Sequence, residues 1–294
     1  MGKGKFMDFL ITLVNGLSLG GIYAMIALGY TMVYGIAKML NFAHGDIIMV
    51  GGYAILVFLS INPILAIAFS ILFCIGLGIV VEKAAYKPLR GASPLAVLIT
   101  AIGVSYFLQS LAQIIFGASP KYVVIANLGN FTLGELTISY ATIITLACSV
   151  IIMIGLTLFV KFTKTGRAMI AVSEDKDAAR LMGVNINSII MITFAIGSAL
   201  AALAGLFSLL RVPTIMPTYG ALPGIKAFTA AVIGGIGSIP GAMLGGILLG
   251  VVECFCNAVP EIAPYTMAVE FAILIVILLV KPTGILGKKR REKV

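Results

Sequence analysis

The feature that most constrains the fold is a series of long apolar runs separated by short polar segments. The first run, from Phe9 to Ala37, contains 29 residues and no charged side chain. A helix needs about 20 apolar residues to cross a bilayer, whereas a strand of a membrane barrel needs only about 10. The composition agrees, because 61% of the residues are hydrophobic and only 11% are charged. We therefore predict an all-α, polytopic transmembrane helix bundle that forms a single domain over residues 1–294.

We expect roughly eight or nine membrane elements in all, because two segments are too short for a full crossing. The apolar run Ile47–Ile61 has 15 residues, and residues 225–236 form a second short piece. Interrupted helices are tolerated in a membrane only where they are buried in protein or line a cavity. If Ile47–Ile61 crosses fully, Met1 lies outside. If it is re-entrant, Met1 lies inside, as Lys3 and Lys5 favour.

Two basic segments orient the bundle. The net charge is +9, and much of it lies in the polar interruption at residues 161–187 and in the tail at residues 288–294. Clusters of lysine and arginine mark the cytoplasmic side of a membrane protein. We therefore place both segments in the cytoplasm, and we do not expect the protein to bind nucleic acid. The first apolar run is longer than the core of a signal peptide, so we expect it to be a retained span.

The polar interruption at residues 161–187 contains the signals of a short capped helix. Ser173 is the N-cap candidate, Asp177 lies in the first turn, and Gly183 is the expected C-terminal stop. A small apolar face is formed by Ala178, Leu181 and Met182. A stiff helix at a membrane surface is suited to contact with another protein, and the alternative is a solvated linker.

Small residues recur in segment 234–250 at intervals typical of close helix packing. They are Gly237, Gly241 and Gly245 in one row and Ala242, Gly246 and Gly250 in another. We predict a packing face, and a homologous partner helix could supply its other half. No βαβ unit surrounds these glycines, so we do not expect a dinucleotide site. The chain has no Walker A motif, so any ATP would be hydrolysed by another chain.

Several polar residues lie beside the first short run. A charge at the bilayer centre costs about 2.5–3.5 kcal/mol, so each ionisable group there is a candidate site. Asn41, His44 and Asp46 precede or begin the run Ile47–Ile61. Free backbone groups at such a break could bind a zwitterion together with these side chains. The alternative is that the three side chains hold the re-entrant turn together through hydrogen bonds.

Three ionisable residues lie in or beside the later apolar runs. Glu253 is a further candidate for a polar path through the bundle, and it could pair with Lys226 across a helical hairpin. For Lys226 and Glu270 we favour snorkelling to the membrane interface.

The cysteines lie in apolar runs without zinc-site spacing, and the lone histidine has no placed nucleophile beside it. We therefore expect neither a metal site nor a catalytic site.

Four motifs give the chain a resemblance to a known family. Asp177, Ala178 and Ala179, followed by Gly183, resemble the EAA motif of ATP-binding-cassette importer permeases, with aspartate in place of glutamate. The Leu-Pro ending of that motif is absent here. Segments 41–46, 166–173 and 224–246 look like the branched-chain amino-acid permease family, specifically its LivH-type subunit.

The resemblance implies one half of a heterodimeric pore in a bacterial or archaeal cytoplasmic (inner) membrane. The implied partners are a LivM-type permease, two ABC ATPase subunits and a periplasmic or lipid-anchored substrate-binding protein. ATP and magnesium would be bound by the ATPase subunits, so no cofactor is expected in this chain. The implied ATPase-coupling residues are Arg167, Asp177, Ala178, Ala179 and Gly183.

Two other classes of transport protein remain open. An ion-coupled secondary carrier would need an acidic relay inside the bundle, for which Glu253 and Glu270 are the candidates. A passive amide or urea channel is the other alternative. Similar motifs occur in importers of urea, amides and other amino acids, so the resemblance does not fix the substrate.

Overall fold

The computed structural model describes residues 3–126, 128–133 and 136–287. In this part of the chain, seven helices are long and apolar enough to cross a membrane, the last extended by the 3-10 turn η3 (Ala263–Tyr265). They are α1 (Lys3–Ala37), α3 (Pro63–Val81), α4 (Pro94–Phe116), α5 (Tyr140–Phe162), α8 (Ile186–Arg211), α10 (Ile239–Ala258) and α11 (Thr266–Val280). Two shorter apolar helices are α2 (His44–Phe58) and α9 (Ala221–Gly234). These elements confirm the predicted polytopic bundle with two interrupted helices.

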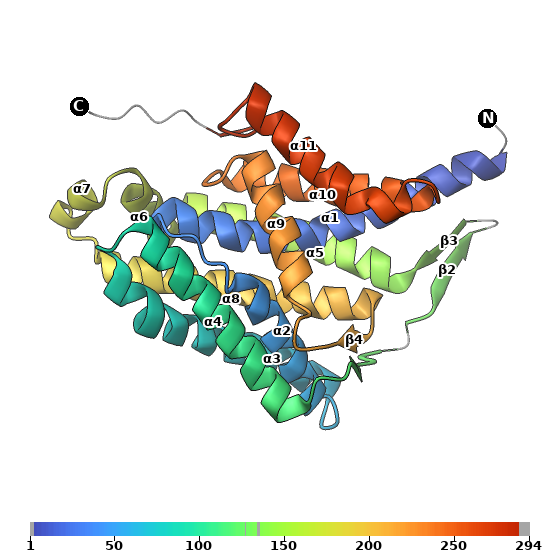
Figure 1. Ribbon diagram of the computed structural model, residues 1–294, viewed down its shortest axis with the longest axis horizontal. Coiled ribbons are helices and arrows are strands. Elements are labelled where there is room, and N and C mark those ends of the chain that lie inside the picture. The colour runs from blue at the N-terminus through green and yellow to red at the C-terminus, as the bar shows by residue number, and fades with distance from the viewer. Residues whose placement is uncertain (1–2, 127, 134–135, 288–294) are drawn as a thin grey trace.

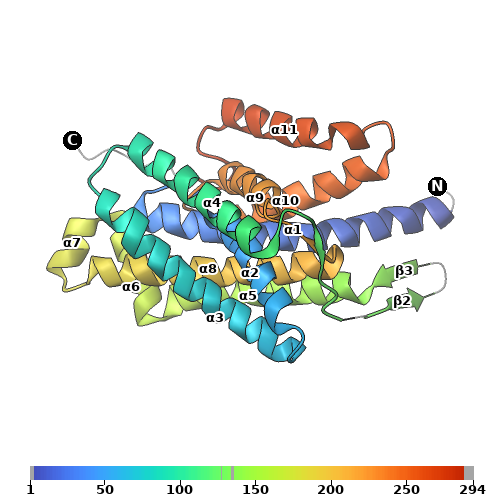
Figure 2. The ribbon, with the colours of Figure 1, turned by 60° about the horizontal axis from the view of Figure 1, so that its bottom comes forward.

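The two ends of the bundle carry different small elements. Helices α6 (Lys164–Glu174) and α7 (Lys176–Leu181) lie at one end of the long axis, which we call the α7 end (Figure 1). The antiparallel hairpin of β2 (Asn130–Leu133) and β3 (Leu136–Ser139) lies at the other, the hairpin end. Helix α1 begins at the hairpin end and finishes at the α7 end, as Figure 2 also shows. The sequence left open whether the first helix begins on the same side of the membrane as residues 161–187 or on the opposite side. In the structure, α1 begins at the end of the bundle opposite α7 (Figure 1).

Short elements complete the connections. The π-helical turn η1 (Glu82–Tyr86) and the 3-10 turn η2 (Lys87–Leu89) join α3 to α4. Strand β1 (Lys121–Tyr122) pairs antiparallel with β4 (Thr214–Ile215), which links the segment after α4 to the segment before α9. The basic tail at residues 288–294, expected in the cytoplasm, lies outside the described residues.

Helix α1 is the central element of the core. Every side chain from Ile22 to Leu28 is buried, as expected for a helix that is apolar on all sides. Helix α10 packs directly on the backbone of α1. A Cβ atom added to Gly20 would lie 2.6 Å from the Cα atom of Ile247, so only glycine allows this approach.

The row of small residues on α10 packs within the chain. A Cβ atom at Gly241 or Gly245 would meet backbone oxygens of α9, and one at Gly246 or Gly250 would meet the backbone of α1. Gly237, which has a φ of +93°, lies next to Gly35 near the end of α1. The sequence suggested that a homologous partner helix could supply the other half of this contact, but α1 and α9 of the same chain make it.

This packing predicts a contrast between two glycine-to-alanine variants. A Cβ atom at Gly250 would lie 2.1 Å from the backbone nitrogen of Gly20, whereas nothing lies within 4 Å of one at Gly155 in α5. We expect Gly250→Ala to lower the free energy of unfolding by about 1–3 kcal/mol through overpacking. Gly155→Ala should leave it unchanged or raise it by up to about 1 kcal/mol through helix propensity. Denaturation in mixed micelles measures both, and equal effects would contradict the packing.

Candidate functional site

The polar segment at residues 161–187 contains two helices rather than one. Helix α6 ends at Glu174, Asp175 has an extended backbone, and α7 begins at Lys176. The N-cap predicted at Ser173 is therefore wrong. Ser173 lies inside α6, where its hydroxyl donates a hydrogen bond to a carbonyl three residues earlier.

Asp175 is the N-cap of α7. Its carboxylate accepts hydrogen bonds from the backbone N–H groups of Asp177 and Ala178, both at 3.0 Å. A carboxylate in this place satisfies two amides that have no partner within the helix, and the positive end of the helix dipole stabilises its charge. Because the backbone of Asp175 is extended, α6 and α7 are two separate helices, and the chain changes direction between them.

Helix α7 ends as the sequence predicts. Gly183 has a φ of +82°, the left-handed conformation that favours glycine. The N–H of Val184 donates to the carbonyl of Ala179, and the N–H of Gly183 donates to the carbonyl of Arg180, each at 3.0 Å. These two bonds form a Schellman motif, which satisfies the last carbonyls of the helix. Helix α7 is thus closed at both ends by its own residues.

Two large apolar side chains are exposed at the end of α7. Leu181 and Met182 are 89% and 84% exposed. Beside them lies a groove of about 480 Å³, lined by Arg180, Gly183, Val184, Asn185, Ile186 and Asn187. Among the predicted coupling residues, Ala179 is buried, and the exposed ones are Arg167, Asp177, Ala178 and Gly183.

Polar contacts connect this surface to the rest of the bundle. The Nζ atom of Lys176 donates a 3.2 Å hydrogen bond to the carbonyl of Ala37, the last residue of α1. Burial lowers the pKa of Lys176, and the nearby Arg90 lowers it further. Arg90 follows η2 and donates to the carboxylate of Glu82 and to the side-chain oxygen of Asn187 in α8.

The amino ends of the two short helices meet inside the bundle. A Cβ atom added to Gly45 of α2 would lie 2.5 Å from the carbonyl oxygen of Gly220 and 3.2 Å from the Cα atom of Gly224. We call these three residues the glycine junction. From it, α2 continues towards β4, where Gly52 packs on Ile215, and α9 continues towards the turn that packs on the end of α1. The two half-helices therefore run in opposite directions from one buried contact.

Two of the polar residues beside the junction bind neighbouring helices. The side-chain oxygen of Asn41 accepts a 2.7 Å hydrogen bond from the hydroxyl of Tyr86 in η1. The Asp46 carboxylate accepts from Ser105 and, at 2.9 Å, from Gln109, both in α4. Asn41 and Asp46 are each 2% exposed. Both therefore hold the start of α2 in place, which is one of the two roles proposed from the sequence.

The side chain of His44 faces α1 and α8 rather than η1 or α4. Its ring lies against the backbone of Gly29 in α1 and Gly197 in α8, and Tyr30 contacts it edge-on with ring centroids 4.9 Å apart. The side chain is buried, and its Nε2 atom has no hydrogen-bond partner among the described residues. The sequence brought Asn41, His44 and Asp46 together, but in the structure they face three different groups of helices.

A buried ion-pair network lies on another side of α1. The Nζ atom of Lys226 in α9 lies 2.7 Å from the Glu253 carboxylate in α10 and 3.1 Å from the Glu270 carboxylate in α11. The hydroxyl of Tyr23 in α1 donates to Glu253 at 2.7 Å. The predicted pairing of Lys226 with Glu253 is confirmed. The prediction that Lys226 and Glu270 snorkel is wrong, because their side chains are 11% and 1% exposed.

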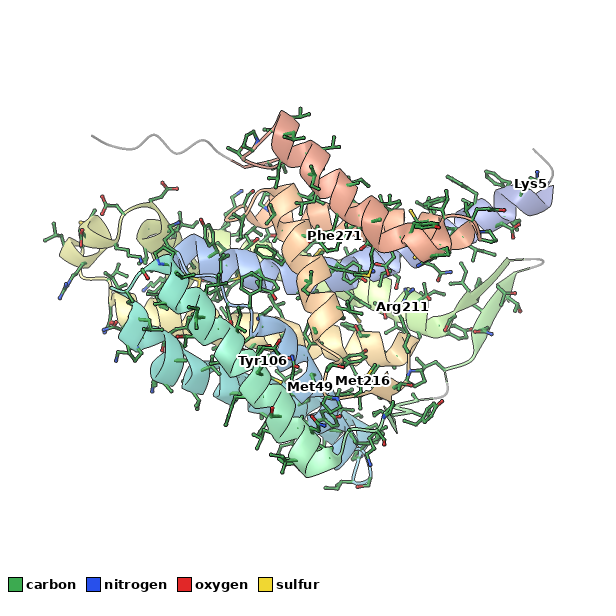
Figure 3. All side chains as sticks on the ribbon, in the orientation of Figure 1. Lys5, Met49, Tyr106, Arg211, Met216 and Phe271 are labelled. Atoms are coloured by element: carbon green, nitrogen blue, oxygen red, sulfur yellow. The ribbon has the colours of Figure 1, made fainter. Side chains whose placement is uncertain are left out.

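The network joins four helices through one ammonium group, two carboxylates and the hydroxyl of Tyr23. A further positive charge, Arg211, lies towards the hairpin end of α8 (Figure 3). Its guanidinium donates a 3.2 Å hydrogen bond to the carbonyl of Asn15 in α1. One carboxylate oxygen of Glu270 has no hydrogen-bond partner in the described part of the chain.

Sequence reasoning missed several partners in these contacts. Ser105 and Gln109 are four residues apart, so they lie on one face of α4, and this spacing of polar residues in an apolar run was a usable signal. Tyr86 and Arg90 carried no comparable signal, because a tyrosine and an arginine after a membrane helix are common as interfacial anchors.

The proteins to which this chain is similar are transport permeases. Residues 12–278 match the family described as the branched-chain amino acid transport system permease component. The chain is 45% identical to the high-affinity branched-chain amino acid permease protein BraD of Pseudomonas aeruginosa, over 99% of each chain. It is 41% identical to LivH of Escherichia coli, again over 99% of each. A probable LivH of Methanocaldococcus jannaschii is 29% identical over 90% of this chain and 89% of the relative.

The ion-pair network predicts that the loss of stability caused by removing Lys226 is reversed when the two carboxylates are also neutralised. Lys226→Met removes the only cation within 4 Å of either carboxylate in the described residues, so we expect the free energy of unfolding to fall by about 3–5 kcal/mol. Adding Glu253→Gln and Glu270→Gln removes the stranded charges and should restore most of that loss. Denaturation in mixed micelles compares the variants, and a triple variant as unstable as Lys226→Met would contradict a charge-based role.

Proposed function

Because the chain belongs to the branched-chain amino-acid transport permease family, we propose that it is the LivH-type half of a heterodimeric import pore. The pore moves branched-chain amino acids inward, and ATP hydrolysis on separate subunits drives the movement. The observation that carries this proposal is α7, a capped helix with Leu181 and Met182 exposed at one end of a membrane bundle. A short rigid helix with an apolar tip is suited to insertion into a cleft of another protein.

The partners follow from this assignment. We place the α7 end in the cytoplasm, where two ABC ATPase subunits dock on the α7 helices of this chain and of a LivM-type permease. A substrate-binding protein, periplasmic or lipid-anchored, delivers the amino acid to the hairpin end. The membrane is the cytoplasmic membrane of a bacterium or archaeon. ATP and magnesium bind to the ATPase subunits rather than to this chain.

We place the substrate path beside the glycine junction, with Asp46 as its charged residue. Asp46 is buried and accepts two hydrogen bonds from neutral side chains, and no cationic side chain of the described residues pairs with it. A passing amino acid carries an ammonium group that can supply this missing charge. Asn41 and His44 flank the same break in the helix. Glu253 fits a path less well, because Lys226 and Tyr23 already occupy its carboxylate.

The coupling role of α7 predicts loss of transport without loss of ATP hydrolysis. Asp177→Lys reverses a charge in the first turn of α7, and Gly183→Pro cannot adopt the φ of +82° that closes the helix. In proteoliposomes with all partners, we expect each variant to reduce ATP-dependent leucine uptake at least about tenfold, an effect of about 1.4 kcal/mol, while remaining inserted. Glu174→Lys, an equal charge reversal on α6, should transport normally.

The wild-type complex in the same assay separates the classes of transporter. Uptake that needs ATP and the binding protein supports the importer. Uptake driven by an ion gradient without ATP would support a secondary carrier, and passive equilibration of amides or urea would support a channel. Normal uptake by both α7 variants would contradict the docking assignment.

The substrate path predicts a specific effect of Asp46→Asn. An asparagine side chain has nearly the same shape and can still accept from one neighbour and donate to the other, so the bundle should keep its stability. Removing the charge should raise the apparent KM for leucine by about tenfold or more, because a charge-assisted hydrogen bond contributes about 1.5–3 kcal/mol. An unchanged KM with normal stability would assign Asp46 to the scaffold alone.

A further inference from the structure

The end of α1 is held by a residue of the docking helix. Ala37 is the last residue of α1, and the carbonyls of a last helical turn have no partner within the helix. Lys176, the first residue of α7, donates to this carbonyl at 3.2 Å. A lysine at a helix carboxyl end is also attracted by the negative end of the helix dipole. The contact therefore joins α7 to the membrane core across 139 residues of sequence.

The contact lies directly before a break in the membrane helices. Lys38 leaves α1 with a φ of +62°, a left-handed conformation that is uncommon for residues other than glycine. Residues 38–43 then lead without a full helical turn to α2 and the glycine junction. This segment is short and anchored, because Asn41 is bonded to Tyr86. Only residues 38–43 therefore separate the Ala37 carbonyl from His44, the first residue of α2.

The other end of the α7 segment is connected to a different place. Beyond Gly183, Asn187 in α8 accepts a hydrogen bond from Arg90, and Arg90 also binds Glu82 in η1. These contacts attach α8 to the connection between α3 and α4, and they do not involve Ala37. Lys176, by contrast, attaches α7 to the last residue of α1.

We propose that Lys176 is a positioning residue that transmits the movement of α7 to residues 38–43 and so to the amino end of α2. The proposal rests on the proposed function of α7 as the docking helix for the ATPase. When the ATPase subunits close, α7 moves with them, and the bond to Ala37 draws the end of α1 and the following segment along. This movement acts on Gly45 and Asp46 at the glycine junction.

The test compares transport with ATP consumption in the complete complex. Lys176→Met keeps the length and most of the volume of the side chain but removes the donor. Lys176→Arg keeps a cationic donor. Lys164→Ala removes an exposed lysine of α6 and is the matched control. Each permease is reconstituted with its partners in proteoliposomes, and ATP hydrolysis, leucine uptake and co-purification of the ATPase subunits are measured.

We expect Lys176→Met to retain the ATPase subunits and substrate-stimulated hydrolysis but to consume at least about tenfold more ATP per leucine transported, an effect of about 1.4 kcal/mol. Lys176→Arg should restore most of the coupling, and Lys164→Ala should resemble the wild type. An unchanged ATP-to-leucine ratio in Lys176→Met would overturn the proposal. Loss of the ATPase subunits would also overturn it, because Lys176 would then act in docking.

A second measurement does not depend on the stability of a variant. Hydrogen exchange of the wild-type complex is compared without nucleotide and with the ATP-bound state trapped. We expect the amides of residues 38–43 to change protection together with those of α7. Constant protection at residues 38–43 would overturn the proposal. Failure of the importer assignment itself is seen separately, as an absence of ATP-dependent uptake by the wild type.

Discussion

The structure depends on one requirement, that every backbone N–H and C=O group within the hydrocarbon layer finds a partner inside the protein. Helices α2 and α9 are both interrupted, so the non-helical segments before them must be shielded from lipid. Helix α1, buried on all sides from Ile22 to Leu28, and helix α8 provide much of this shield. Glycines at positions 45, 220 and 224 then let the two half-helices meet backbone to backbone. The long helices are therefore arranged around the break in the short ones.

The buried charges follow from the same requirement. A half-helix such as α9 has few turns with which to hold its place, and Lys226 fastens it to α10 and α11 through two carboxylates. Each of these charges alone would be costly in the membrane, but together they stabilise one another. The hydroxyl of Tyr23 brings α1 into the same network. The polar network thus holds α9 in its place in the bundle, whereas the full-length helices are held by the packing of their additional apolar turns.

The sequence predicted the features that depend on local pattern. Long apolar runs located the spans, the 15 residues of Ile47–Ile61 indicated an interrupted helix, and Gly183 was the correct stop for α7. The N-cap was missed because Ser173 and Asp175 are both good caps, and only tertiary contact decides where α6 ends. The small residues of α10 indicated close packing but could not show that α1 and α9 are the partners. Asn41, His44 and Asp46 are neighbours in sequence, and their directions depend on helices that are distant along the chain.

The opposed directions of α2 and α9 bring two non-helical stretches of backbone to one contact. Polar, non-helical backbone approaches the junction from the α7 end through residues 38–43 and from the hairpin end through residues 212–220. Between them lies little more than the contact of Gly45 with Gly220 and Gly224. The fit at this contact is therefore set by three residues that have no side chains. A backbone shift of about a methyl group's width would therefore open or overlap this contact directly, because no side chain lies between the two backbones to adjust.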